Sequence, residues 1–169
     1  MKLYLLWTLP LLASADSCGA LPAERNAALY GRPTQSSVLE LGQAINAVDG
    51  NAEADPLKGS CSSTRLQHAP WWRVDLLAEH NVSTVRVTGR GCPNSRAWLA
   101  RAQVRVGSRR AHDRNPLCGE LVVDQVTQEL CCQGMQGRFV SISLYNVNSI
   151  LSLCEVEVLA VPAGQESCL

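Results

Sequence analysis

The sequence predicts an all-β, disulfide-bonded β-sandwich. Three features carry this prediction: short runs in which apolar and polar residues alternate, clusters of Gly, Pro, Asn and Ser between the runs, and eight cysteines. Alternation with a period of two gives each strand one apolar face, and two packed sheets bury such faces between them. Several short strands separated by turn residues favour antiparallel pairing.

The alternating runs occupy most of the chain after residue 70. In WWRVDLL, Trp72, Val74 and Leu76 share one face, and Arg73 and Asp75 share the other. The predicted strands cover residues 71–77, 81–89, 102–107, 137–145 and 150–161.

The N-terminus predicts export. Lys2 precedes an apolar run that continues through Ala13, and small residues follow near Ala15. This is the pattern of a secretory signal peptide over residues 1–15. The run is too short to cross a bilayer and no later run is long enough, so we expect no membrane span. Residues 16–169 then form one secreted, extracellular domain.

The cysteines predict disulfides. Their number is even and no CxxC spacing is present, which favours disulfides over zinc in an exported chain. Cys131 and Cys132 are adjacent at a predicted strand end, so their side chains point to opposite faces and pair with different partners. Cys18 and Cys168 lie near the two mature ends and are candidates to tie the termini together. The sequon at Asn81 predicts a glycoprotein.

Composition excludes two classes of function. The formal net charge is zero, whereas nucleic-acid binding needs a basic excess, so we expect no nucleic-acid partner. The three histidines lie outside any recognisable catalytic motif, so we expect no enzyme. Arginine outnumbers lysine thirteen to two, and the planar guanidinium suits directed hydrogen bonds.

Motifs along the domain resemble those of one family. PWWRVDL, VRVTGRG, NPLCG, CQGMQGRFVSISL and LSLCEVEV follow each other, preceded by NAALYGRPTQSS and NAVDGN. Over residues 26–159 the chain resembles the fucolectin family, the F-type lectins. The resemblance implies a discoidin-like jelly-roll β-sandwich that binds L-fucose without catalysis and holds a structural calcium ion. Family members often form homo-oligomers and recognise glycans on microbes or host cells, which implies a role in innate immunity.

The oxygen-rich stretch NAVDGNAEADPLKGSC is the candidate calcium site. Calcium takes about six to eight oxygens from carboxylates, amides and carbonyls, and a turn rich in Asp and Asn supplies them. Such a turn also forms without an ion, as a solvated Asx turn. The resemblance assigns the ion to residues matching Asn46, Asp49, Asn51, Ser60 and the pair Cys154-Glu155.

The resemblance also implies two disulfides. One links Cys61 to Cys154 and clamps the candidate calcium loop to the last strand, and the other links Cys118 to Cys132. Cys92 and Cys131 would then pair by elimination.

The candidate sugar site includes the RGCPNSR loop. In the family, a His, an Arg, an Asp two residues later and a further Arg or Lys grip the sugar. This chain keeps Arg90, has Arg96 as the candidate for the second cation, and has Ser63 at the His position. Cys92 stands at the Asp position or the Asp is deleted, and Pro93 removes the family's adjacent cysteine pair. The prediction is a glycan site for fucose or a related sugar that retains part of the family's groups.

Two other functions fit the sequence. The stretch RAQVRVGSRRAHDR is a candidate surface for sulfated glycans, and its other interpretation is a solvated sheet edge whose charges discourage strand pairing. Its arginines form a cationic stripe in which Arg101 and Arg105 share one strand face, and the full set is Arg101, Arg105, Arg109, Arg110 and Arg114. The second function is that of a family relative that has lost sugar binding and acts through protein contacts. His68 lies just before PWW, and we expect it to be structural or exposed.

Overall fold

The computed structural model describes residues 18–19, 21, 23–92, 97–122 and 125–164. The strands are β1 (Arg25–Asn26), β2 (Arg32–Gln35), β3 (Ser62–Ser63), β4 (Gln67–His68), β5 (Trp71–Thr88), β6 (Gln103–Gly107), β7 (Leu117–Glu120), β8 (Thr127–Ser143), β9 (Asn148–Ser149), β10 (Ser152–Leu153) and β11 (Glu155–Pro162). Short 3₁₀ turns are η1 (Ala27–Tyr30), η2 (Ala44–Ala47), η3 (Pro56–Lys58) and η4 (Ala97–Leu99). The predicted all-β class is confirmed. Among the described residues, no helix has the length and apolar character needed to cross a bilayer.

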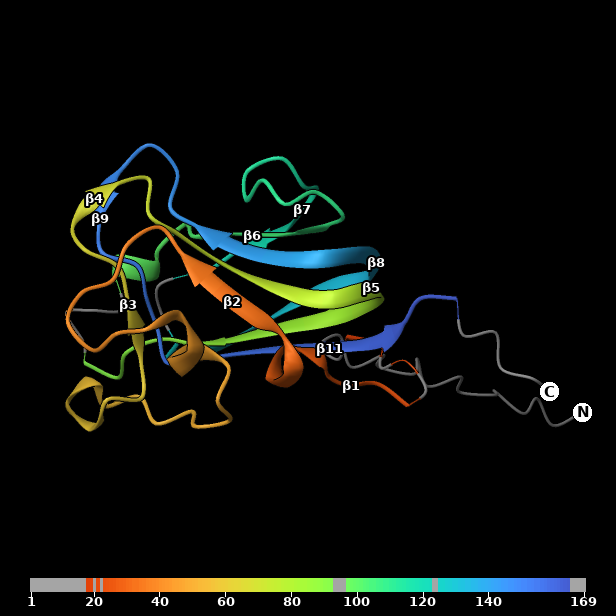
Figure 1. Cartoon of the computed structure of the whole chain (residues 1–169), viewed down its shortest axis with the longest axis horizontal. Helices are drawn as coiled ribbons and strands as arrows, with labels where there is room; N and C mark the ends of the chain where they lie inside the picture. Colours follow the sequence, from red (N-terminus) through yellow and green to blue (C-terminus); the bar gives the residue numbers. More distant parts are fainter. Residues whose placement is uncertain (1–17, 20, 22, 93–96, 123–124, 165–169) are drawn as a thin grey trace, which may run out of the picture.

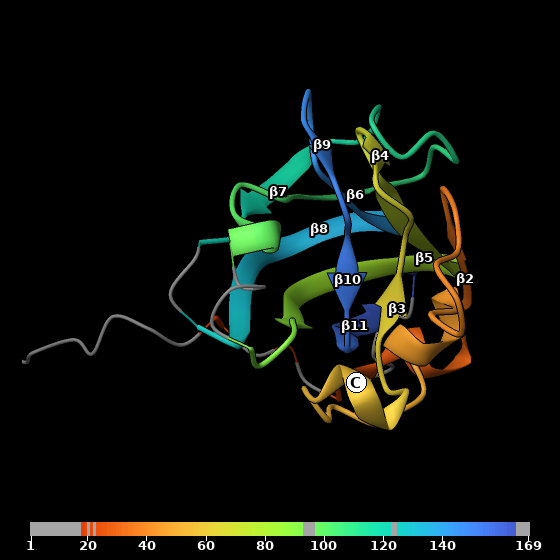
Figure 2. The ribbon, with the colours of Figure 1, turned by 90° about the vertical axis from the view of Figure 1, so that its left-hand side faces the viewer.

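One antiparallel sheet dominates the fold (Figure 1). Its strand order is β1-β11-β5-β8-β6-β7, and β2 also pairs with β5. Two small sheets, β3–β10 and β4–β9, lie across one end of the long strands (Figure 2). The long strands therefore position a group of loops and short strands at that end.

The long strands bend where sequence periodicity predicted a break. The two predicted strands at residues 71–77 and 81–89 merge into one continuous strand, β5, which ends at Thr88. Its pairing with β8 shifts between Asp75 and His80 and again between Val82 and Thr84. Extra residues of this kind bend a strand without ending it. Residues 150–161, by contrast, divide into β10 and β11.

Valine fills much of the core. Val74, Val85, Val104 and Val158 have no exposed surface, and burying a side chain of this size stabilises the fold by about 1.5–3 kcal/mol. Trp72 is also fully buried, and its indole Nε1 donates a 3.1 Å hydrogen bond to the Ala44 carbonyl. This bond satisfies the polar atom of the indole and fixes η2, which leads into the candidate calcium loop.

Three disulfides join described residues: Cys18–Cys131, Cys61–Cys154 and Cys118–Cys132. The two disulfides implied by the resemblance are present, and Cys131 and Cys132 have different partners as predicted. The expected pairs Cys18–Cys168 and Cys92–Cys131 are wrong. Cys131 is exposed and meets the N-terminal segment at Cys18, whereas Cys132 is buried against the core.

The predicted glycosylation site lies within a strand. Asn81 is half-buried in β5, and Ser83 of its sequon is buried and donates to Glu24 Oε2 at 2.6 Å. Glycosylation of Asn81 stays a prediction. The predicted signal peptide, residues 1–15, and Cys168 lie outside the described residues.

Candidate functional site

Arg90 lies at the end of the fold that the small sheets cover. It follows the last residue of β5 by two positions. Ser63 in β3 and Ser152 in β10 oppose each other in the antiparallel register, so strand pairing brings both hydroxyls to one place. Figure 2 shows β3 and β10 side by side across this end.

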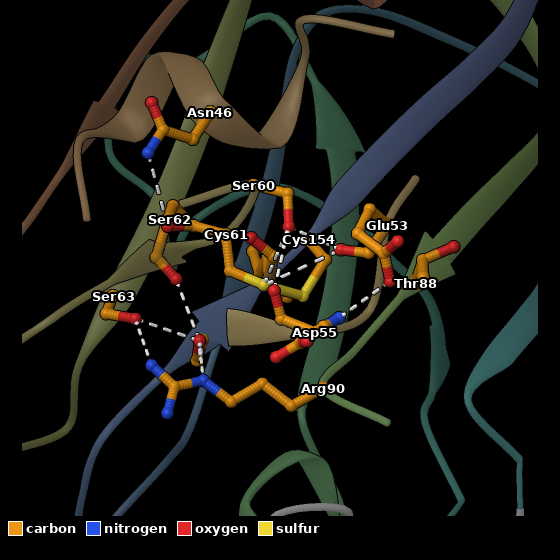
Figure 3. The surroundings of a disulfide bond; sticks show 12 residues. Asn46, Glu53, Asp55, Ser60, Cys61, Ser62, Ser63, Thr88, Arg90 and Cys154 are labelled. Atoms are coloured by element: carbon orange, nitrogen blue, oxygen red, sulfur yellow. Dashed lines mark hydrogen bonds between the residues drawn. A yellow bond between two sulfur atoms is a disulfide. The ribbon is translucent and has the colours of Figure 1, made fainter. Parts of the chain in front are cut away.

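Two serine hydroxyls hold the Arg90 guanidinium (Figure 3). Nε donates to Ser152 Oγ and Nη2 donates to Ser63 Oγ, both at 2.8 Å. Ser152 Oγ donates in turn to the Ser62 carbonyl at 2.9 Å. The 2.9 Å contact between the two hydroxyls therefore has Ser63 as its donor, and both serine oxygens accept from Arg90. Within the described part of the chain, Nη1 makes no hydrogen bond.

The charge of Arg90 is held by neutral partners. Its guanidinium forms no ion pair with any carboxylate in the described ranges. Its Cζ lies 5.6 Å from the ring centroid of Trp98 in η4, a cation–π contact. Burial lowers the pKa of Arg90, and the nearby Cys92 offsets this in part. Arginine still remains charged at neutral pH, so Arg90 is a cationic donor.

A cavity of about 280 Å³ opens beside Arg90. Its lining residues are Leu39, Glu40, Leu41, Gly42, Leu57, Gly59, Cys61, Ser63 and Arg90. Leu41 and Leu57 are 83% and 93% exposed and offer apolar surface at the rim. Glu40 is exposed and adds a carboxylate acceptor. The cavity thus combines a cationic donor, a hydroxyl, an acceptor and apolar surface, which together suit the hydroxyls and the C–H face of a pyranose.

Not every predicted sugar-site residue can be placed. The structure puts Arg90 and Ser63 in one cavity. Arg96 lies outside the described residues. His68 is exposed in β4, as expected, and does not line the cavity.

Sequence reasoning missed three side chains around Arg90. Ser152 is 62 positions away in the chain, and only the pairing of β3 with β10 brings it to the guanidinium. Trp98 comes from η4, and Glu40 comes from the segment between β2 and η2. No local motif marks any of the three as a neighbour of Arg90.

The candidate calcium residues include a buried carboxylate. Glu155 is 3% exposed, and neither of its oxygens has a hydrogen-bond partner among the described residues. Burial, and then the Asp49 carboxylate, raises the pKa of Glu155 to about 7. The backbone amides of Gly50 and Asn51 lie close enough to lower this pKa in part, but not in hydrogen-bonding geometry. A buried, unpaired carboxylate is costly, and a cation fits such a position.

Four of the other candidate ligands lie in the segment from η2 to β3, and Cys154 directly precedes Glu155. Asp49 Oδ1 accepts from the Asn51 amide at 2.9 Å, and Ser60 Oγ donates to a backbone carbonyl of the same loop at 2.5 Å. Asn46 Nδ2 donates to three backbone carbonyls, including that of Cys61. The Cys61–Cys154 disulfide ties the end of this segment to the residue just before β11 (Figure 3).

The donor chemistry fits a hard cation. Within the described ranges, no cluster of three or more His, Cys, Asp or Glu side chains is suited to a metal. A site here would therefore use amide, hydroxyl and backbone oxygens beside the carboxylates of Asp49 and Glu155. Oxygen-only sets of this kind suit calcium rather than transition metals.

Known proteins resemble this chain in sequence and fold. The family of NedA-like, galactose-binding domains matches residues 46–142. Fucolectin-4 of Anguilla japonica is 39% identical over 149 residues, which cover 82% of this chain and 81% of the relative. The fucolectin from striped bass (Morone saxatilis) serum superimposes with a TM-score of 0.77 and 37% identity over 82% of this chain. A fucose binding module of Streptococcus pneumoniae superimposes with a TM-score of 0.72 and 26% identity, over 83% of this chain and 99% of the module.

The lengths of these proteins differ. The chain spans 48%, about half, of the striped bass lectin chain. Within the shared part, the solved relatives confirm the predicted jelly-roll β-sandwich. The identity to Fucolectin-4 extends over about four-fifths of both chains. The chain therefore belongs to the fucolectin (F-type lectin) family, whose members are lectins and not enzymes.

Proposed function

We propose that the chain is a lectin that binds fucose or a related sugar on cell-surface glycans, in the cavity beside Arg90. One observation carries the proposal: a half-buried arginine borders this cavity, with hydroxyl partners and no described carboxylate to cancel its charge. The names of the relatives support the choice of fucose as the first ligand to test.

The cavity offers complementary groups to a monosaccharide. Arg90 donates to sugar hydroxyls or the ring oxygen, and each charge-assisted hydrogen bond contributes about 1.5–3 kcal/mol. Glu40 accepts from a sugar hydroxyl, and the exposed Leu41 and Leu57 cover the C–H face. Ser63 and Ser152 orient the guanidinium, which the missing family Asp would otherwise do.

The proposal includes a structural calcium ion. Asn46, Asp49, Asn51, Ser60, Cys154 and Glu155 would hold it through side-chain and backbone oxygens. When bound, the ion supplies positive charge to the carboxylates of Asp49 and Glu155. Cys61 lines the sugar cavity and is bonded to Cys154, so order in the calcium loop extends to the cavity wall.

The disulfides fit an extracellular protein, and the proposed protein is secreted. Its role would be recognition of glycans on microbes or host cells in innate immunity. We expect a homo-oligomer, because several linked sites raise the avidity of a weak single site. Analytical ultracentrifugation tests this expectation, and a monomer at all concentrations would contradict it.

A glycan array tests the sugar site. The secreted protein is applied with calcium, with a chelator, and as the Arg90→Ala variant. We expect binding to fucosylated glycans that the variant loses. Arg25→Ala is the matched control, because Arg25 is exposed in β1 and lies outside the cavity.

Two results would overturn the site as proposed. One is equal glycan binding by the wild type and the Arg90→Ala variant. The other is a folded wild-type protein that binds no glycan, which would favour a family relative that acts through protein contacts.

A further inference from the structure

The loop between β6 and β7, residues 108–116, carries unpaired positive charge. Arg109, Arg110 and Arg114 are exposed and form no ion pair within the described part of the chain. Asp113 is the single acidic residue of this loop. Figures 1 and 2 both place the loop at the top of the molecule, apart from β3 and β10.

The structure changes the arginine stripe expected from the sequence. Arg101 lies before β6 with a φ of 63°, so the expected common strand face with Arg105 is wrong. The edge strand is β7, and the three exposed arginines lie on the loop instead. Protection of a sheet edge therefore does not explain them.

Side chains hold this loop in one conformation. Asn115 is 2% exposed, and its amide both accepts from the Arg109 N–H at 3.0 Å and donates to the Arg109 carbonyl at 2.8 Å. Arg105 Nη1 donates to the Asn115 carbonyl at 2.8 Å, and Ser141 Oγ donates to the His112 carbonyl at 2.7 Å. A loop fixed in this way loses little conformational entropy when a ligand binds.

A buried arginine adds charge beneath the loop. Arg73 is 8% exposed, its Nη1 donates to the Arg110 carbonyl, and its Nη2 donates to Thr34 Oγ1 at 3.0 Å. Its Nε is buried without a hydrogen-bond partner among the described residues. Asp75 in the same strand is already paired with Arg138 at 2.7 Å. Neutral oxygens thus hold Arg73 without cancelling its charge.

A cavity of about 370 Å³ adjoins the loop. Its lining includes Gln103, Arg105, His112, Asp113, Ser143 and Tyr145. Tyr145 is 66% exposed and presents an aromatic surface beside these polar groups. One sugar unit of a polysaccharide can occupy such a cavity while charged groups on neighbouring units of the polysaccharide contact the loop.

We propose that residues 108–116 and the adjoining cavity bind sulfated polysaccharide, independently of the Arg90 cavity. Arginine forks match the oxygens of sulfate in pairs, and several arginines on one rigid loop match a repeating polyanion. The disulfides fit the extracellular space, where sulfated polysaccharides occur.

Immobilised heparin with a salt gradient tests this surface. We expect retention at about 0.15 M salt and elution as salt screens the charges. The variant Arg109→Gln/Arg110→Gln/Arg114→Gln should lose heparin affinity by at least about tenfold. The matched control, Arg25→Gln/Arg32→Gln/Arg65→Gln, removes the same charge from exposed arginines that form no ion pair in the described chain. It should keep wild-type affinity.

Ligand controls use the wild-type protein. Desulfated heparin should not be retained, and single-stranded DNA should bind more weakly than heparin. The proposal fails if the wild type is not retained, if the control variant loses as much affinity, or if DNA binds as tightly as heparin. If the triple variant does not fold, the single variant Arg114→Gln is tested in its place. We expect it to lose about threefold in heparin affinity.

Discussion

Arg73 and Arg90 share one kind of environment and differ in what covers them. Arg73 is buried and Arg90 is half-buried, and burial lowers the pKa of each. Both donate to uncharged oxygens and lie near aromatic rings, Trp71 and Phe139 for Arg73 and Trp98 for Arg90. The loop of residues 108–116 covers Arg73, whereas Arg90 borders an open cavity.

This difference separates structural from binding roles. A carbonyl or hydroxyl orients a guanidinium without neutralising it, so an arginine held in this way keeps its capacity to attract an acceptor. At Arg73 that capacity is used to fix a loop. At Arg90 it is available to a ligand. Removal of Arg73 should therefore lower mainly folding stability, and removal of Arg90 should lower mainly glycan affinity.

The largest expected effect is on folding stability. Arg73→Ala removes two hydrogen bonds and two cation–π contacts and leaves a void, so we expect a loss of about 3 kcal/mol in the free energy of unfolding. Arg90→Ala also removes two hydrogen bonds and one cation–π contact, but its side chain borders an open cavity that water can fill, so we expect a smaller loss of about 1–2 kcal/mol. Urea denaturation measures both. Equal losses would contradict the distinction drawn between the two arginines.

Glu155 extends the comparison to a buried anion. Unlike the two arginines, the Glu155 carboxylate has no hydrogen-bond partner among the described residues. We therefore expect a bound calcium ion to stabilise the folded protein. At a calcium concentration of about 100 times the dissociation constant, binding adds about 2.7 kcal/mol. Chelation should then lower the melting temperature by about 5–10 °C. The melting temperature of Glu155→Gln should respond little to chelator, and the same response as wild type would contradict the site.

A smaller effect is expected from the residue that orients Arg90. Ser152→Ala removes one acceptor of the guanidinium but no group that lines the cavity. We expect a loss of about fivefold in glycan affinity, equivalent to one hydrogen bond of about 1 kcal/mol. Isothermal titration calorimetry measures the loss. Ser149→Ala is the matched control, because Ser149 is a half-buried serine of β9 outside the cavity. Unchanged glycan affinity in Ser152→Ala would contradict the proposal that Ser152 positions Arg90.

Periodicity in the sequence was the most informative signal for the fold. Alternation predicted the strands and their apolar faces, because burial imposes a period of two on any sandwich strand. It did not predict that β5 continues from Trp71 to Thr88, since a bulge interrupts the pattern without ending the strand. The opposed directions of Cys131 and Cys132 followed from strand geometry, but the partner of Cys131 depended on the path of the N-terminal segment.

The candidate site was less accessible from sequence. Arg90 and Ser63 came from the family resemblance. Ser152 could not be found, because its contact with Arg90 is set by the register of β3 and β10 rather than by spacing along the chain. In the sequence, Arg73 has the pattern of a solvent-facing polar residue on an alternating strand. It is buried because the loop between β6 and β7 packs over it, which the sequence pattern does not indicate.

Arg138 is the contrasting case, an arginine whose charge is cancelled by a carboxylate. Its Nε and Nη2 donate to the two oxygens of Asp75 at 2.7 and 2.8 Å. This hydrogen bonding lowers the pKa of Asp75, with a smaller contribution from the Leu77 amide and against the effect of burial. Because the folded-state pKa lies below the unfolded value, the pair stabilises the fold above about pH 4 and loses this contribution as pH falls.

The pair is partly exposed, so Asp75→Asn should lose only about 0.5–1 kcal/mol at pH 7. The difference between variant and wild type should shrink when urea denaturation is repeated near pH 3. A difference of equal size at both pH values would mean that Asp75 acts through packing and not through its charge. Arg90 forms no ion pair with a carboxylate of the described residues, so its contribution should stay constant over the same pH interval.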